Sequence, residues 1–221
     1  MSVFWDEGST NLENFCRDAR LPSTTYATPF NYLIVPKPEQ MLRASVGLAF
    51  RRARLQYIYS ILRGKDLDTG LFSEERREQQ FEKLKVAQAH TLDIQNWHEF
   101  IKALKQAGYN NESFISSNNN ILYSYVFFLI GRIDYKVDLY ELKKLIAKWF
   151  FMCSITGRYT GSPETAMEMD LAKFRSVDNA DDFVKELNSI IDSQLTSDFW
   201  EVTLPMDLST SSFRSPSLFA Y

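Results

Sequence analysis

Turn-forming residues and cysteines are scarce in this sequence. Its 221 residues include only 8 glycines and 7 prolines, which argues against a β-sandwich with many turns and favours long helices. The two cysteines, Cys16 and Cys153, lie in no metal-ligand spacing, and we expect them to be reduced thiols. Two histidines cannot complete a familiar zinc pattern with them. We therefore expect neither a metal nor a cofactor.

Long apolar runs and a basic charge balance are also missing. The longest apolar run, Ile121 to Gly131, is far shorter than the roughly 20 residues that span a bilayer. The first residues after Met1 include the polar and charged Ser2, Asp6 and Glu7, so we expect no secretory signal. The net charge of −3 excludes a basic footprint over the whole domain. These absences predict a cytoplasmic protein without membrane contact.

Apolar and aromatic residues are plentiful, and they recur at helical spacing. Hydrophobic residues make up 45% of the chain and aromatic residues 14%, enough for a core that needs no disulfide. The periodicity predicts an all-α fold, an irregular bundle of about eight helices with little or no β-structure. The expected helices cover residues 8–20, 38–63, 73–88, 93–107, 121–130, 138–153, 162–174 and 179–194.

Capping residues define several of these boundaries. Ser9 or Thr10 is the expected N-cap of the first helix and Ser73 that of the third. Gly64 and Gly108 occupy the position that follows a helix end. The proline-containing stretch 21–37 is expected to be an extended connector with a strand-like patch at 32–35.

The predicted domain organisation is a single helical domain over residues 1–221. Residues 1–37 form its arm and connector, and residues 203–221 form a lead-in to a further domain. Ser215 would cap a new helix with Pro216 at its first position. A helix of about one turn is unstable alone. The sequence therefore reads as a fragment of a larger chain.

No complete catalytic pattern is recognisable. His90 and His98 both fall on predicted helices among polar neighbours and are expected to be solvated. No phosphate-binding loop, dinucleotide fingerprint or metalloprotease motif is present. We expect no enzymatic activity from this chain.

An arginine-rich face is the first candidate contact surface. Arg43, Arg51 and Arg54 share one side of the helix predicted over 38–63, and no acidic residue lies between Glu39 and Asp66. Such a face can be solvated and salt-bridged, can bind phosphate, or can contact a neighbouring acidic domain. Because an unpaired buried charge is costly, an interdomain contact competes with the first two alternatives.

The loop from Thr156 to Gly161 is the second candidate. Arg158 and Tyr159 are residue types that stack on bases and donate hydrogen bonds to nucleic acids. Ser162 and Glu164 begin the next helix, whose free N–H groups favour an anion. The alternative is a tight interhelical turn followed by ordinary helix-start residues.

Several segments together resemble one protein family. They are Trp149 to Met152, Thr156 to Thr165, Glu168, Asp170-Leu171, Pro38 to Arg43, Gly64 to Asp66, Ser116 to Tyr125, Leu129 to Arg132 and Phe213 to Tyr221. Over roughly residues 5–221 the chain resembles the middle region of a large prokaryotic family. Its members join an N-terminal ParB/sulfiredoxin-like domain to a C-terminal HNH-type nuclease domain, and are similar to GmrSD-type, modification-dependent (type IV) restriction enzymes.

This resemblance implies a role in restriction and phage defence for the whole protein, as an NTP-dependent DNA endonuclease. The family's nucleotide-hydrolysing motif lies upstream of the matched region and its nuclease motif downstream, so neither activity transfers to this chain. What the resemblance implies here is a helical spacer that positions two active domains. The flanking domains are its expected partners. DNA is the alternative partner, contacted through the arginine-lined helix and the Arg158 loop.

Overall fold

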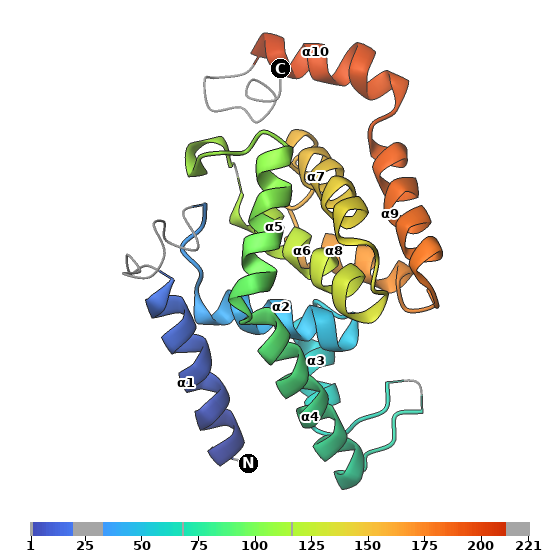
Figure 1. The fold of residues 1–221 in the computed structure, drawn as a ribbon. Helices are drawn as coiled ribbons and strands as arrows, with labels where there is room; N and C mark the ends of the chain where they lie inside the picture. Colours follow the sequence, from blue (N-terminus) through green and yellow to red (C-terminus); the bar gives the residue numbers. More distant parts are fainter. Residues whose placement is uncertain (1, 20–32, 68, 116, 211–221) are drawn as a thin grey trace.

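The computed structural model describes residues 2–19, 33–67, 69–115 and 117–210, which fold into helices (Figure 1). The α-helices are α1 (Ser2–Asp18), α2 (Pro38–Phe50), α3 (Leu55–Leu62), α4 (Glu74–Thr91), α5 (Ile94–Gln106), α6 (Asn118–Leu129), α7 (Leu139–Ile155), α8 (Pro163–Lys173), α9 (Ala180–Gln194) and α10 (Leu204–Thr210). A 3-10 turn, η1 (Glu112–Phe114), and two π-helical turns, η2 (Ile130–Asp134) and η3 (Phe199–Thr203), accompany them. Within these ranges one isolated bridge, Lys65 with Phe72, is the sole β-type pairing. The all-α prediction is confirmed.

Polar side chains cap the helices where local sequence predicts a start. Ser73 accepts a hydrogen bond from the backbone N–H of Arg76 (3.4 Å) at the start of α4. Asp93, Asp138 and Asn179 do the same for α5, α7 and α9. Each cap satisfies an N–H group that has no partner inside its helix.

The N-terminal segment differs from expectation. Helix α1 begins at Ser2, so Ser9 and Thr10 lie inside the helix and do not cap it. Gly8 lies within α1 against α4, where the side chain of Gln88 donates to its carbonyl (2.7 Å). A strand-like patch is expected over 32–35. Its described residues, 33–35, are not in a strand, and no described strand lies beside them. The connector residues 20–32 and the predicted helix start at Ser215 and Pro216 lie outside the described residues.

The prediction of a single helix over 38–63 is also wrong. This segment forms two helices, α2 and α3, which are joined by a four-residue link, 51–54. The backbone N–H groups of Ala53 and Arg54 bond to the carboxylate of Glu168 in α8, where a continuous helix would use its own carbonyls. A contact more than a hundred residues away along the chain thus sets this break.

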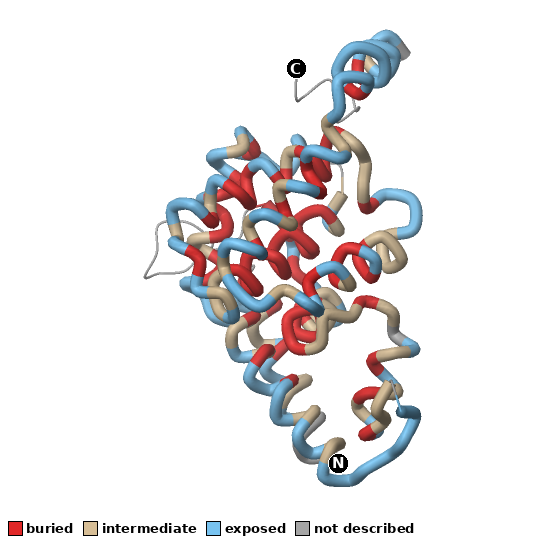
Figure 2. Tube along the Cα trace, turned by 90° about the vertical axis from the view of Figure 1, so that its right-hand side faces the viewer, coloured by how far each residue is buried: buried red, intermediate tan, exposed pale blue. Residues whose placement is uncertain are grey.

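The core is built around α6. All side chains from Asn120 to Leu129 are buried, and α2, α5 and α7 pack against this helix. Trp97 of α5 stacks on Tyr125 with ring centroids 4.0 Å apart. Figure 2 shows the buried segments gathered in the middle of the molecule. A helix hydrophobic on every side must be central.

The last described helix lies apart from this core. Figure 1 shows α10 beyond the end of the bundle formed by α5 and α7. It meets the bundle through a small apolar cluster that contains Ile155, Phe199 and Leu204. None of the described helices is both long and apolar enough to cross a membrane.

Candidate functional site: an arginine–carboxylate network beside an open cleft

The link between α2 and α3 exposes backbone groups that other elements bind. Arg51 ends α2 in the left-handed region, at φ 53° and ψ 42°, which is uncommon for a residue with a Cβ. Its N–H still donates to the carbonyl of Gly47 (3.1 Å). Its own carbonyl accepts from Nε (3.2 Å) and Nη2 (3.1 Å) of Arg175. The strained residue is therefore held from both sides.

Glu168 is the centre of the network. Its side chain is 10% exposed. One oxygen accepts from the N–H groups of Ala53 (2.7 Å) and Arg54 (3.2 Å). The other accepts from the guanidinium groups of Arg52 (3.0 Å) and Arg175 (2.5 Å). Burial acts to raise the pKa of Glu168, but these donors outweigh it and lower the pKa below its ordinary value.

Asp170 makes a second, deeper ion pair on α8. Its side chain is 1% exposed and binds Nε (2.9 Å) and Nη2 (2.5 Å) of Arg158 in a bidentate geometry. The hydroxyl of Tyr159 donates to the same carboxylate (2.7 Å). Burial acts to lower the pKa of Arg158, whereas the hydrogen bonds and charge of Asp170 raise it further above its usual value. Burial, reinforced by Asp170, raises the pKa of Tyr159.

The outer members of the network are more exposed. Nη1 of Arg43 lies 2.5 Å from Oε1 of Glu164 at the start of α8. Arg51 pairs with Asp134 of η2 and donates to the carbonyl of Leu48. Among the four arginines proposed as contact residues, only Arg54 has a guanidinium group without a carboxylate partner in the described part of the chain; its Nη2 lies 3.4 Å from Oγ1 of Thr165. The structure thus gathers most of the predicted contact residues around one helix, α8.

The residues at the start of α8 do little to support the predicted anion site there. Ser162 precedes Pro163, as predicted, but makes no capping bond with its side chain. Glu164 uses its carboxylate on Arg43. Tyr159 is fully buried, edge-on to Tyr123 at 4.8 Å, so its ring offers no exposed stacking surface. The nucleic-acid role of these residues stays a prediction.

Sequence reasoning missed the partners of these arginines. They are the carboxylates of Asp134, Glu168 and Asp170, and also Arg175, which donates to the backbone carbonyl of Arg51. The one signal pointing to them is the acid-free stretch before Asp66, whose cations need carboxylates from elsewhere in the chain.

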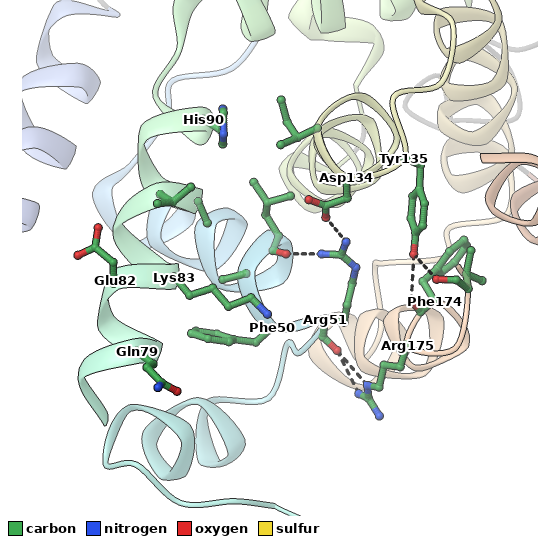
Figure 3. Close-up of a pocket in the computed structure, with 16 residues that line it drawn as sticks. Phe50, Arg51, Gln79, Glu82, Lys83, His90, Asp134, Tyr135, Phe174 and Arg175 are labelled. Carbon is green, nitrogen blue, oxygen red and sulfur yellow. Dashed lines mark hydrogen bonds and ion pairs between the residues drawn. The ribbon is translucent and has the colours of Figure 1, made fainter. Parts of the chain in front are cut away.

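An open cleft of about 800 Å³ lies next to the network. Its lining comes from the end of α2, the middle of α4, the turn η2 and the segment after α8 (Figure 3). Arg51 and Asp134 belong to both the network and the cleft. Lys83 of α4 extends over the ring of Phe50, with Nζ 5.9 Å from the ring centroid. Cations and apolar surface therefore lie side by side.

The π-helical turn η2 shapes one wall of this cleft. Its Gly131 lies against Leu142 and Phe183, where a Cβ would be 2.6 Å and 2.8 Å from their side-chain carbons. Tyr135 follows the turn and donates its hydroxyl hydrogen to the carbonyl of Val177 (2.9 Å). Burial raises the pKa of Tyr135, and the charge of Arg51 opposes this shift in part. Single π-turns inside helices often mark functional sites.

Other chemistry is sparse in the described ranges. They contain no group of three or more His, Cys, Asp or Glu side chains that could bind a metal ion. His90 lines the cleft, half-buried. Comparison of the chain with protein-family models, with curated proteins and with solved structures found no match.

Proposed function

We propose that this chain is a non-catalytic helical spacer and interaction domain of a restriction-like protein that carries a ParB-like domain and an HNH nuclease domain. The observation behind the proposal is the binding of Glu168 to both backbone and side chains of the α2–α3 link. A domain that positions two others must resist bending, and a buried, fully hydrogen-bonded ion pair gives one defined geometry at the point where two helices meet.

The proposal also rests on where the ionisable groups are used. The guanidinium groups of Arg43, Arg52 and Arg158 are engaged by carboxylates of α8. Such pairs join distant segments of the chain and hold these segments in a fixed relative position. The expected partners are the flanking domains.

Rigidity and lack of catalysis are both measurable on this chain. Spin labels placed through Glu78→Cys on α4 and Lys185→Cys on α9, both exposed positions, report the distance between the two sides of the bundle. A rigid spacer gives one narrow distance distribution, and a broad or bimodal one would overturn the rigid role. Hydrolysis of DNA or of a nucleoside triphosphate by the purified chain would overturn the non-catalytic role.

A second candidate is single-stranded nucleic-acid binding through α3 and the segment after it. Tyr59 and Phe72 are 66% and 63% exposed. Arg63 lies over the ring of Tyr59 (5.3 Å) and Lys65 over the ring of Phe72 (5.8 Å). Exposed rings with adjacent cations are the elements of a stacking surface for bases.

Binding of a fluorescent oligonucleotide at increasing salt separates the two candidates. The nucleic-acid role predicts an affinity that falls steeply with salt and drops about tenfold in Tyr59→Ala, in line with the energy of one stacked base. Tyr140→Ala is the matched control, because Tyr140 is also exposed (60%) and also carries a lysine over its ring. The spacer role alone predicts no salt-dependent binding, and equal binding by both variants would exclude the α3 surface.

A further inference from the structure

The cleft beside the network is lined by a lysine, Lys83, whose charge is not balanced by an ion pair with any described residue. Its described lining includes the cations Arg51, Lys83 and Arg175 and the acids Glu82 and Asp134. Asp134 pairs with Arg51, and Arg175 pairs with Glu168. Lys83 has no ion pair among the described residues. The carboxylate of Glu82 points away from the cleft (Figure 3). An ammonium group that faces a concave surface and is paired with no carboxylate is a binding element for an anion.

Apolar surface adjoins this ammonium group. The ring of Phe50 lies below Lys83, and both line the cleft (Figure 3). Val86, one turn further along α4, also lines it and is 52% exposed. A ligand that covered Phe50 and Val86 would remove apolar area from water, which is favourable in proportion to that area.

The guanidinium group of Arg51 provides a second donor. Arg51 lies across the cleft from Lys83 (Figure 3). Asp134 and the carbonyl of Leu48 accept from its two terminal nitrogens, and a guanidinium group has five N–H donors in all. The left-handed backbone of Arg51 turns the chain at the edge of the cleft, and strained backbone of this kind gathers at ligand sites.

We propose that this cleft binds a small aromatic anion. The carboxylate or phosphate of the ligand bonds to Lys83 and Arg51, and its flat ring covers Phe50 and Val86. The volume of about 800 Å³ falls within the range of small-molecule sites, about 300–1,000 Å³. The proposal goes beyond the spacer role, because a rigid spacer with an empty cleft is equally able to position two domains.

Titration calorimetry with 1-naphthyl phosphate and 1-naphthoate tests the ligand class. Saturable binding of at least one of them at millimolar concentration or below is expected, and which one binds tighter identifies the preferred anion. Inorganic phosphate supplies the charge alone and 1-naphthol the ring alone, so both are expected to bind about tenfold weaker or more. Equal binding of either control, or no binding of either aromatic anion, would overturn the proposal.

Two variants test the position of the site. Lys83→Met removes the charge but keeps an apolar side chain, and is expected to weaken binding about tenfold; its control is Lys148→Met, at an exposed lysine of α7 outside the lining. Val86→Asp adds a repelling charge beneath the ligand and is expected to abolish binding. Its control is Val202→Asp, at a position 53% exposed on η3. Melting curves confirm folding, and equal binding by cleft and control variants would place the ligand elsewhere.

Discussion

Replacing Glu168 by glutamine removes one charge from the centre of the network and leaves its size unchanged. In the native protein each carboxylate oxygen accepts two hydrogen bonds, one oxygen from two backbone N–H groups and the other from two guanidinium groups. A glutamine has one oxygen and one NH₂ group. In either orientation of the amide, two of these four donors therefore face another donor.

The expected cost follows from those two lost acceptors. Leaving a buried donor unsatisfied costs about 1–3 kcal/mol each. Water reaches the guanidinium groups in part, since the side chains of Arg52 and Arg175 are 19% and 33% exposed. We therefore expect Glu168→Gln to lower the free energy of unfolding by about 2–3 kcal/mol, or the Tm by roughly 5–10 °C for a chain of this size.

Urea unfolding followed by circular dichroism at pH 7 measures this change. Glu186→Gln is the matched control, because Glu186 lies 3.7 Å from Lys173 in a pair whose side chains are 33% and 48% exposed, and such pairs contribute less than about 1 kcal/mol. A loss below about 0.5 kcal/mol in Glu168→Gln, similar to surface substitutions in general, would refute the central role of Glu168.

The same variant has a signature in acid. The pKa of Glu168 is lower in the folded protein than its ordinary value of 4.5, so the unfolded chain takes up a proton first as the pH falls. The stability due to this ionisation is complete above pH 4.5 and is lost as the pH decreases through the folded pKa. The difference in stability between wild type and Glu168→Gln should therefore shrink between pH 7 and strongly acidic pH. A constant difference would contradict an ionised, paired Glu168.

Three further predictions concern packing, backbone strain and thiol chemistry. Gly131→Ala should destabilise the fold by about 1–3 kcal/mol in urea unfolding, because the new Cβ would lie 2.6 Å from Leu142 and 2.8 Å from Phe183; an unchanged midpoint would contradict this packing. Lys136→Gly should stabilise by up to about 1 kcal/mol by removing the strain of an exposed residue at φ 51°, and a loss of stability would argue against that backbone conformation. Cys153 is fully buried, and burial raises its pKa, so it should react with a disulfide reagent only after unfolding; rapid reaction of the folded protein at this thiol would contradict its burial.

Much of the fold follows from short-range patterns in the sequence. Ser73, Asp93 and Asp138 cap helices at the expected positions, because a cap bonds to an N–H group two or three residues away. Gly64 and Gly108 adopt positive φ after α3 and α5 for an equally local reason.

The failures of prediction have long-range causes. The apolar spacing over 38–63 continues without a break, yet α2 ends at Phe50. The helix ends because the link's backbone groups bond to other segments: the N–H groups of Ala53 and Arg54 donate to Glu168, and the carbonyl of Arg51 accepts from Arg175. No pattern within the segment records those partners, so local periodicity predicts one helix where the folded chain has two.

Of the candidate site, the arginines were predictable from the sequence, and their carboxylate partners were not. The arginines were visible as a cationic face, and burial demanded partners for them. Glu164 and Glu168 stand four residues apart and share one face of α8, which meets Arg43 and Arg52. Asp170, two positions further, falls on the opposite side of that helix and meets Arg158. Helix α8 is thus tied on one face to the α2–α3 link and on the other to its own preceding loop. A helix fixed on both faces has little freedom to rotate. The cleft wall that follows it, formed by Phe174, Arg175 and Val177, is therefore set in place by ion pairs of Arg43 and Arg158, two arginines that the sequence predicts as interdomain contacts or, alternatively, as DNA contacts.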